Sequence, residues 1–86
     1  MTESTFIRIP KELFRMEIQR LIYMANQIST FFKSYPENQA IASTGNHMEQ
    51  FWDPRMRQEI LQHVQAGGAG LSAIALAAVR KLDNGP

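Results

Sequence analysis

The side chains that could bind a metal or take part in catalysis are few and scattered along the chain. The two histidines, His47 and His63, each have one carboxylate nearby in sequence, Glu49 and Glu59 respectively. Neither pair has the H-E-x-x-H spacing that places two metal ligands on one helix face. The sequence contains no cysteine, which excludes thiolate ligands and thiol catalysis. We therefore predict that the chain carries no metal or other cofactor.

Hydroxyl nucleophiles and phosphate-binding loops are no better supported. The serines have no organised His and Asp companions and are explained better as helix caps or polar-face residues; they include Ser29, Ser34, Ser43 and Ser72. The run Gly67-Gly68-Ala69-Gly70 is followed by Leu71, whereas a Walker loop needs Lys and then Ser or Thr after its last glycine. The glycines indicate a turn between two helices, and we expect no active site within this chain.

The most distinctive run joins two aromatic residues to a proline and two arginines, Phe51-Trp52-Asp53-Pro54-Arg55-Met56-Arg57. In one interpretation it is a helix corner, with Trp52 in the core and Arg57 stacked on its ring. In the other it is an anchor for a partner, because Trp and Arg are favoured at binding hot spots. The two interpretations are compatible, and the sequence leaves both open.

A helical DNA-binding regulator is the least favoured interpretation of the arginines. Arg55 and Arg57 fall in the first turns of a predicted helix, where a recognition helix carries its base-reading side chains. However, Glu59 follows, and two arginines cannot supply the roughly six to ten phosphate contacts of a tight complex. The net charge of +1 also argues against a polyanionic partner, so we expect no nucleic acid to bind.

Length and composition are those of a small folded module of 86 residues. Hydrophobic residues make up 44% and charged residues 20%, as in globular rather than disordered chains. No run reaches about 18 consecutive apolar residues, so no transmembrane helix is expected. The first ten residues lack the basic-then-apolar layout of a signal peptide. With no cysteine present, these features predict a cytoplasmic protein without a membrane partner.

Apolar periodicity predicts an all-α fold, a small bundle of about four helices joined by short loops. Residues at spacings of three and four form one stripe of the first helix: Phe14, Ile18, Leu21, Ala25, Ile28 and Phe32. Asp53 with Pro54 favours the start of another helix, and Ser72 is a suitable cap for the last. The expected single domain of residues 1–86 has an N-terminal extension and four helices: 1–9, then 10–34, 36–52, 54–66 and 72–82.

Two further expectations concern packing. Pro36 should be the first residue of the second helix, capped by Ser34 or Tyr35. Gly45 lies inside that helix, where glycine costs about 1 kcal/mol relative to alanine, so a neighbouring helix should approach closely there. The first helix has apolar residues outside its main stripe, namely Leu13, Ile22, Met24 and Phe31. This surplus predicts a partner surface and possible self-association of the isolated chain.

Five short runs together resemble the delta subunit of soluble, NAD-dependent, molybdenum-containing formate dehydrogenases. They are Met24-Ala25-Asn26-Gln27-Ile28, Phe31-Phe32, Tyr35-Pro36, the run from Phe51 to Arg57, and Gly67-Gly68-Ala69-Gly70-Leu71. The resemblance covers about residues 18–82, and it is specific because the tryptophan–proline–arginine and glycine runs occur together. Residues 1 to about 16 depart from it, since they are longer than the family leads us to expect.

The resemblance implies a non-catalytic accessory subunit of an enzyme that oxidises formate to carbon dioxide and reduces NAD. In such enzymes a large subunit carries the molybdenum or tungsten pterin and iron–sulfur clusters, companion subunits carry flavin and further clusters, and the delta subunit carries no cofactor. The implied partners are these subunits, and the implied role is to support assembly or stability. A maturation chaperone that leaves after cofactor insertion is the alternative. The predicted partner-binding residues are Trp52, Arg55, Arg57, Phe51, Asn26 and Gln27.

Overall fold

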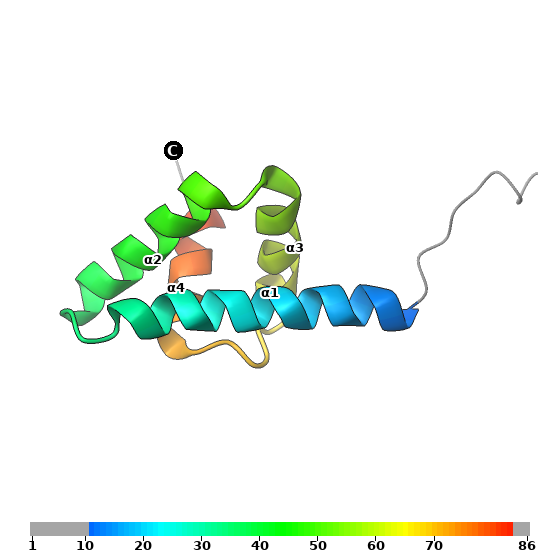
Figure 1. Ribbon diagram of the computed structural model, residues 1–86, viewed down its shortest axis with the longest axis horizontal. Helices are drawn as coiled ribbons and strands as arrows, with labels where there is room; N and C mark the ends of the chain where they lie inside the picture. Colours follow the sequence, from blue (N-terminus) through cyan, green and yellow to red (C-terminus); the bar gives the residue numbers. More distant parts are fainter. Residues whose placement is uncertain (1–10, 84–86) are drawn as a thin grey trace, which may run out of the picture.

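The computed structural model describes the backbone of residues 11–83 and the side chains of residues 15–82, and this part of the chain contains four α-helices and no strand. The helices are α1 (Lys11–Phe32), α2 (Glu37–Phe51), α3 (Pro54–Gln65) and α4 (Ala73–Asp83). The longest, α1, lies across the other three, which gather on one side of it (Figure 1). The predicted all-α fold of four helices is confirmed for these residues. The predicted extension, residues 1–9, lies outside them.

Two helices begin where a side chain satisfies the free amides of the first turn. Asp53 has extended backbone angles, and its Oδ1 accepts a hydrogen bond from the Met56 amide at 2.8 Å, with Pro54 as the first helical residue. The Ser72 hydroxyl accepts from the Ala75 amide at 3.1 Å before α4. Both are N-caps that compensate amides left without a partner inside the helix.

The start of α2 differs from the prediction. Pro36 is the N-cap (φ −52°, ψ 147°) and not the first helical residue, and no side chain caps the helix, so neither Ser34 nor Tyr35 does so. The Pro36 carbonyl accepts from the Ala40 amide at 2.8 Å, which starts the helix without a side-chain acceptor. The preceding turn is closed by the Tyr35 amide donating to the Phe32 carbonyl at 3.0 Å, which is why α1 ends at Phe32 and not at residue 34.

The glycine run ends α3 in a tight turn, as predicted. Gly67 and Gly68 have positive φ values of 124° and 71°, and their amides donate to the Val64 and His63 carbonyls, each at 2.9 Å. This is the bonding pattern of a Schellman motif, which glycine adopts without the steric cost of a Cβ atom. A Cβ on Gly68 would also lie 2.5 Å from Cδ1 of Leu76, so the turn packs directly against α4.

The core is formed by all four helices. Its buried members are Leu21 and Ala25 of α1, Met48 of α2, Trp52 of the α2–α3 corner, Ile60 and Val64 of α3, and Ala75 and Val79 of α4. Gly45 is also buried and faces α4, where a Cβ would lie 3.7 Å from the Ala78 carbonyl oxygen. The predicted helix approach at Gly45 is confirmed, although the space would accept a methyl group.

Candidate functional site

Eight residues from α1, α2 and the loop between them form a mostly aromatic surface that we call the aromatic face: Tyr23, Gln27, Ile28, Phe31, Phe32, Tyr35, His47 and Phe51. At its centre lies a groove of about 320 Å³, here called the aromatic groove. The groove is lined by Gln27, Ile28, Phe31 and Phe32 of α1 and by His47 of α2. Core residues of the same two helices, Leu21 and Ala25 of α1 and Met48 of α2, hold the walls of the groove in position.

Contacts between side chains join the members of the aromatic face on each helix, and the groove between α1 and α2 is lined by both groups. The rings of Phe31 and Phe32 meet edge to face with centroids 5.0 Å apart, and Phe32 meets Tyr35 at 6.0 Å. On α2, the His47 and Phe51 rings lie 4.7 Å apart. At the other end of the face, Nε2 of Gln27 donates to the Tyr23 hydroxyl at 3.0 Å.

The aromatic side chains of this face are more exposed to water than is usual for such large apolar groups. Phe31 is 74% exposed, Phe51 69%, Tyr23 64% and Tyr35 46%. With a full area of roughly 200 Å² per aromatic side chain, these four leave about 500 Å² of aromatic surface in water. The largest apolar patch of a typical monomer measures about 300–600 Å² and is often functional. The aromatic face lies in the upper part of that range.

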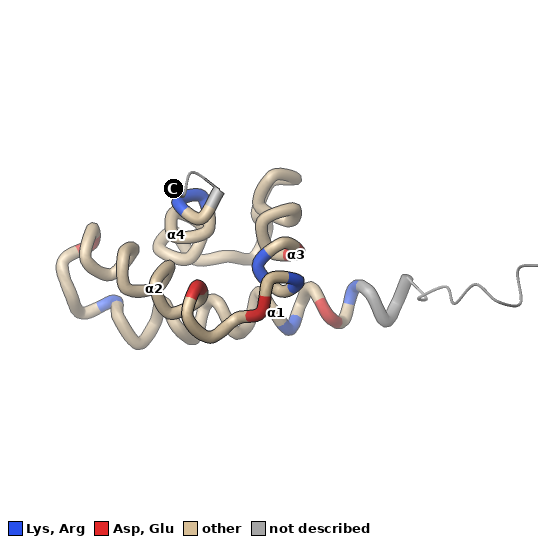
Figure 2. The backbone as a smooth tube through the Cα atoms, turned by 90° about the horizontal axis from the view of Figure 1, so that it is seen from above, with Lys and Arg blue, Asp and Glu red and all other residues tan. Residues whose placement is uncertain are grey.

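Charged side chains are absent from the helix segments that line the aromatic groove, whereas Tyr35 and Phe51 lie just outside these segments. Residues 21–32 of α1 and residues 38–48 of α2 contain no Asp, Glu, Lys or Arg, and these stretches are uniformly tan in Figure 2. The charges of α1 lie in its N-terminal half, near the start of α3, where Glu17 pairs with Arg55. A surface without charges loses little hydration on burial, which suits protein–protein contact.

The predicted helix corner is largely occupied by internal contacts. Trp52 is only 4% exposed and belongs to the core. Nη1 of Arg57 donates to the backbone carbonyls of Trp52 and Glu49, the latter at 3.3 Å. This guanidinium therefore braces the C-terminal end of α2 through its carbonyl oxygens, where a positive charge is favoured.

Arg55 lies on the surface and bridges two helices. Its Nη2 contacts both carboxylate oxygens of Glu17 on α1 at 3.1 Å, and its Nε donates to Glu59 at 3.1 Å. The hydrogen bond to Glu59 and the negative charges of Glu17 and Glu59 raise the pKa of the Arg55 guanidinium above its ordinary value. Ion pairs at such exposed positions stabilise a fold only weakly.

Asn26 holds the glycine turn against α1. Its Nδ2 donates to the Gly70 carbonyl at 2.9 Å, and its Oδ1 accepts from the Ser72 amide at 2.8 Å. The Ser29 and Ser72 hydroxyls are 2.9 Å apart, and the Ser29 hydroxyl also donates to the Asn26 carbonyl. We call this set the polar clamp: Asn26, Ser29, Gly70 and Ser72. It fixes the start of α4.

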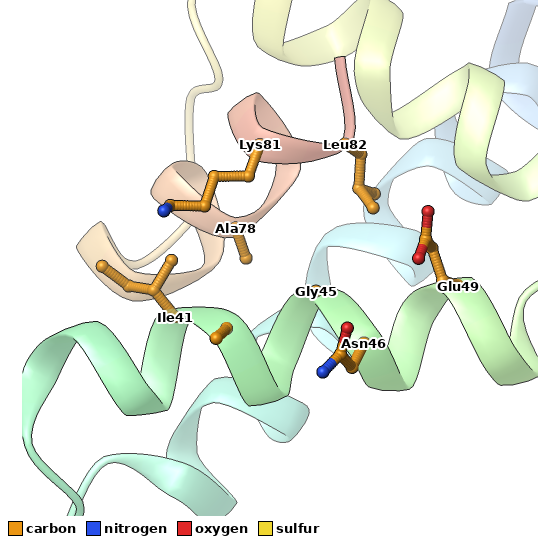
Figure 3. Close-up of a pocket in the computed structure, with 8 residues that line it drawn as sticks. Ile41, Gly45, Asn46, Glu49, Ala78, Lys81 and Leu82 are labelled. Carbon is orange, nitrogen blue, oxygen red and sulfur yellow. The ribbon is translucent and has the colours of Figure 1, made fainter. Parts of the chain in front are cut away.

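A second groove, of about 200 Å³, runs between α2 and α4 (Figure 3). Small residues, Gly45 and Ala78, form its floor, and Glu49 and Lys81 lie at different sides of it. On a helix with 100° per residue, its α2 residues project roughly opposite to His47 and Phe51. The aromatic face and this groove therefore flank α2 on different sides.

The two histidines have local contacts that do not assemble a metal centre in the described part of the chain. His47 packs against Phe51, and Nε2 of His63 lies 2.7 Å from the Ala69 carbonyl oxygen. Among residues whose side chains are described, no three His, Cys, Asp or Glu residues gather in a way that could hold a metal ion. Over the same residues, no helix has the length and hydropathy needed to cross a membrane.

Comparison with protein families gives the decisive observation. Residues 20–79 match the family described as NADH-dependent formate dehydrogenase delta subunit, FdsD. The chain belongs to this family. No curated protein and no solved structure gave a significant match. As a delta subunit, the chain is part of a formate dehydrogenase complex, and its partners are the other subunits of that enzyme.

The matched region of this delta subunit contains the aromatic face, the polar clamp and all six predicted partner-binding residues. Gln27 lines the aromatic groove and Phe51 packs against His47, another residue of that groove, whereas Arg55 and Arg57 lie at the corner that holds Trp52. Asn26 belongs to the polar clamp. The role of these six residues in binding a partner stays a prediction.

Sequence reasoning missed His47 and two of the most exposed aromatic residues, Tyr23 and Tyr35, as parts of a site. One signal was present: Phe31 and Phe32 are adjacent on a helix, so their side chains point about 100° apart and together widen the apolar surface beyond the main stripe. A second signal was the uncharged stretch of residues 21–32, which is longer than a single buried stripe requires.

Proposed function

We propose that this delta subunit is a non-catalytic accessory subunit that supports assembly or stability of formate dehydrogenase by binding its cofactor-bearing large subunit through the aromatic face. The observation that carries this proposal is the exposure of Phe31, Phe51 and Tyr23 around a groove whose helix segments, 21–32 and 38–48, contain no charged residue. Burying that surface in the complex would remove its contact with water and stabilise both partners.

The size of the aromatic face supports a subunit contact. A standard interface buries about 800 Å² on each partner, and its centre is enriched in aromatic side chains and poor in charges. The four exposed aromatic residues provide about 500 Å² of such a centre. The polar residues around them, together with Arg55 at the nearby corner, would supply the rim.

The absence of catalytic activity in this subunit is proposed from its sequence. Without cysteine it has no thiolate for an iron–sulfur cluster or for thiol catalysis. Its two histidines lie on different helices, α2 and α3: His47 packs against the Phe51 ring, and Nε2 of His63 lies 2.7 Å from the Ala69 carbonyl oxygen. The chemistry of formate oxidation would then belong to its partners.

The test is co-purification of the complete complex with a tagged delta subunit. The double variant Phe31→Ser, Phe51→Ser should lose the large subunit from the eluate, while Met16→Ser should retain it. Met16 is a matched control because it is also exposed, at 62%, and lies on α1 away from the aromatic groove. Circular dichroism should show both variants to be helical. Normal recovery of the large subunit with the folded double variant would refute the proposed surface.

The same material separates an accessory subunit from a maturation chaperone. An accessory subunit should be stoichiometric in fractions that reduce NAD with formate, and complexes lacking it should lose that activity faster on warming. A chaperone should be enriched on large subunits that lack the pterin cofactor and be absent from active fractions. The second pattern would overturn the proposal in favour of a transient role.

A further inference from the structure

We infer that the free delta subunit forms a symmetric homodimer in which Phe51 of each copy enters the aromatic groove of the other, and that this dimer excludes binding of the large subunit. Exclusion of the large subunit rests on the proposed function, because both contacts use the aromatic face. The homodimer rests on the geometry of that face alone.

The face presents a projecting side chain and a groove next to each other. Phe51 is the last residue of α2, is 69% exposed and packs against the His47 ring. His47 is also a wall of the aromatic groove, whose other walls come from α1. At about 320 Å³ the groove has room for one benzyl side chain. The lining residues Ile28 and Phe32 would give that ring an apolar environment.

This arrangement is self-complementary. In a dimer with two-fold symmetry, the same surface of both copies meets, so each contact occurs twice. Because Phe51 adjoins the groove through His47, one rotation can place each Phe51 in the opposite groove. A second copy would use the projection and the groove at the same time.

Charge and area also fit a second copy. Two identical charged surfaces would repel each other, but the stretches that line the groove, 21–32 and 38–48, contain no charged residue. The exposed aromatic area of about 500 Å² per copy is more than half of the roughly 800 Å² that each partner of a stable complex buries. The remaining area would come from neighbouring residues such as Gln27 and Tyr35.

Sedimentation equilibrium of the purified full chain tests the dimer. The wild type should approach twice its mass of 9.8 kDa as concentration rises. Phe51→Ser removes the projecting ring, and Gln27→Trp fills the groove, so each should weaken self-association on the order of tenfold or more. Met16→Ser should behave as the wild type. A wild type that stays monomeric, or a Phe51→Ser variant that dimerises normally, would overturn the inference.

Mixing the two variants provides a sharper test of the reciprocal contact. Phe51→Ser retains an open groove and Gln27→Trp retains the projecting ring, so a mixed pair regains one of the two contacts that each variant alone lacks. The mixture should therefore associate more tightly than either variant by itself. Mixtures no tighter than their components would show that general adhesion, and not insertion of Phe51, joins the copies.

Competition separates this inference from the proposed function. Adding the large subunit to the labelled dimer should release labelled monomers into the heteromeric complex. A dimer that persists beside a normally bound large subunit would refute shared use of the face. A monomeric chain whose Phe31→Ser, Phe51→Ser variant still loses the large subunit would refute the dimer and leave the proposed function standing.

Discussion

Replacing Asn26 by alanine removes two hydrogen bonds that join α1 to the start of α4. Asn26 donates to the Gly70 carbonyl at 2.9 Å and accepts from the Ser72 amide at 2.8 Å. Each such bond contributes about 0.5–1.5 kcal/mol net, and the half-buried Ser72 amide would lose its acceptor. The expected loss is about 2 kcal/mol, a large part of the roughly 4–13 kcal/mol available to a chain of this length.

The assay is urea and thermal denaturation of the isolated chain, followed by circular dichroism. For a domain of this size a loss of about 2 kcal/mol corresponds to a fall in Tm of roughly 8–16 °C. The neighbouring variant Gln27→Ala is a matched control, because Gln27 is exposed and its hydrogen bond among the described residues goes to Tyr23 of the same helix. It should change stability by less than about 0.5 kcal/mol. Equal effects of the two substitutions, or an Asn26→Ala variant as stable as the wild type, would refute the polar clamp as the link between α1 and α4.

Substitutions at three further positions test local features of the fold. Asp53→Ala should lower the free energy of unfolding by about 1 kcal/mol, whereas Asp53→Asn should cost little because asparagine can also accept from the Met56 amide. Equal losses of stability for the two variants in urea denaturation would contradict the capping role. Gly45→Ala should raise the free energy of unfolding by about 0.5–1 kcal/mol, because alanine favours the helix and its Cβ would meet Ala78 at ordinary contact distances. A lower thermal midpoint would show that the packing of α2 against α4 needs glycine there. Arg55→Gln should lower the thermal midpoint slightly at low salt and not at high salt, because salt screens the ion pairs of Arg55 with Glu17 and Glu59. A fall in the midpoint that is the same at both salt concentrations would mean that Arg55 acts through packing.

The features predicted correctly from sequence are those decided by neighbouring residues. Asp53 caps α3 and Ser72 caps α4 because each needs only the amides two or three positions ahead. The end of α3 followed from its glycines, which alone tolerate the positive φ values found there. Pro36 was misplaced by one position, because its fixed φ suits both the N-cap and the first helical residue and only ψ distinguishes them.

The candidate site depended on tertiary contacts and was therefore only partly predictable. Asn26 was selected as a lesser partner residue, and its bonds reach residues 44 and 46 positions further along the chain. Arg57 was expected to stack on Trp52, and its described hydrogen bonds go to backbone carbonyls. Phe51 was predicted as a partner-binding residue from the run that contains it, and it is exposed because α2 ends there and the chain turns away. Periodicity gives the direction of a side chain and not what lies in that direction.

The polar clamp has a consequence for the order in which the chain folds. It closes a ring that leaves α1, passes through α2 and α3, and returns to α1 at the glycine turn. Closing a ring of 44 residues costs about 3 kcal/mol of chain entropy beyond a constant term, so this contact should form late, after local helix formation. The Ser72 amide, sequestered by Asn26, then exchanges its hydrogen only when the ring opens. Its exchange rate would report, at a single atom, how often α4 detaches from the rest of the bundle.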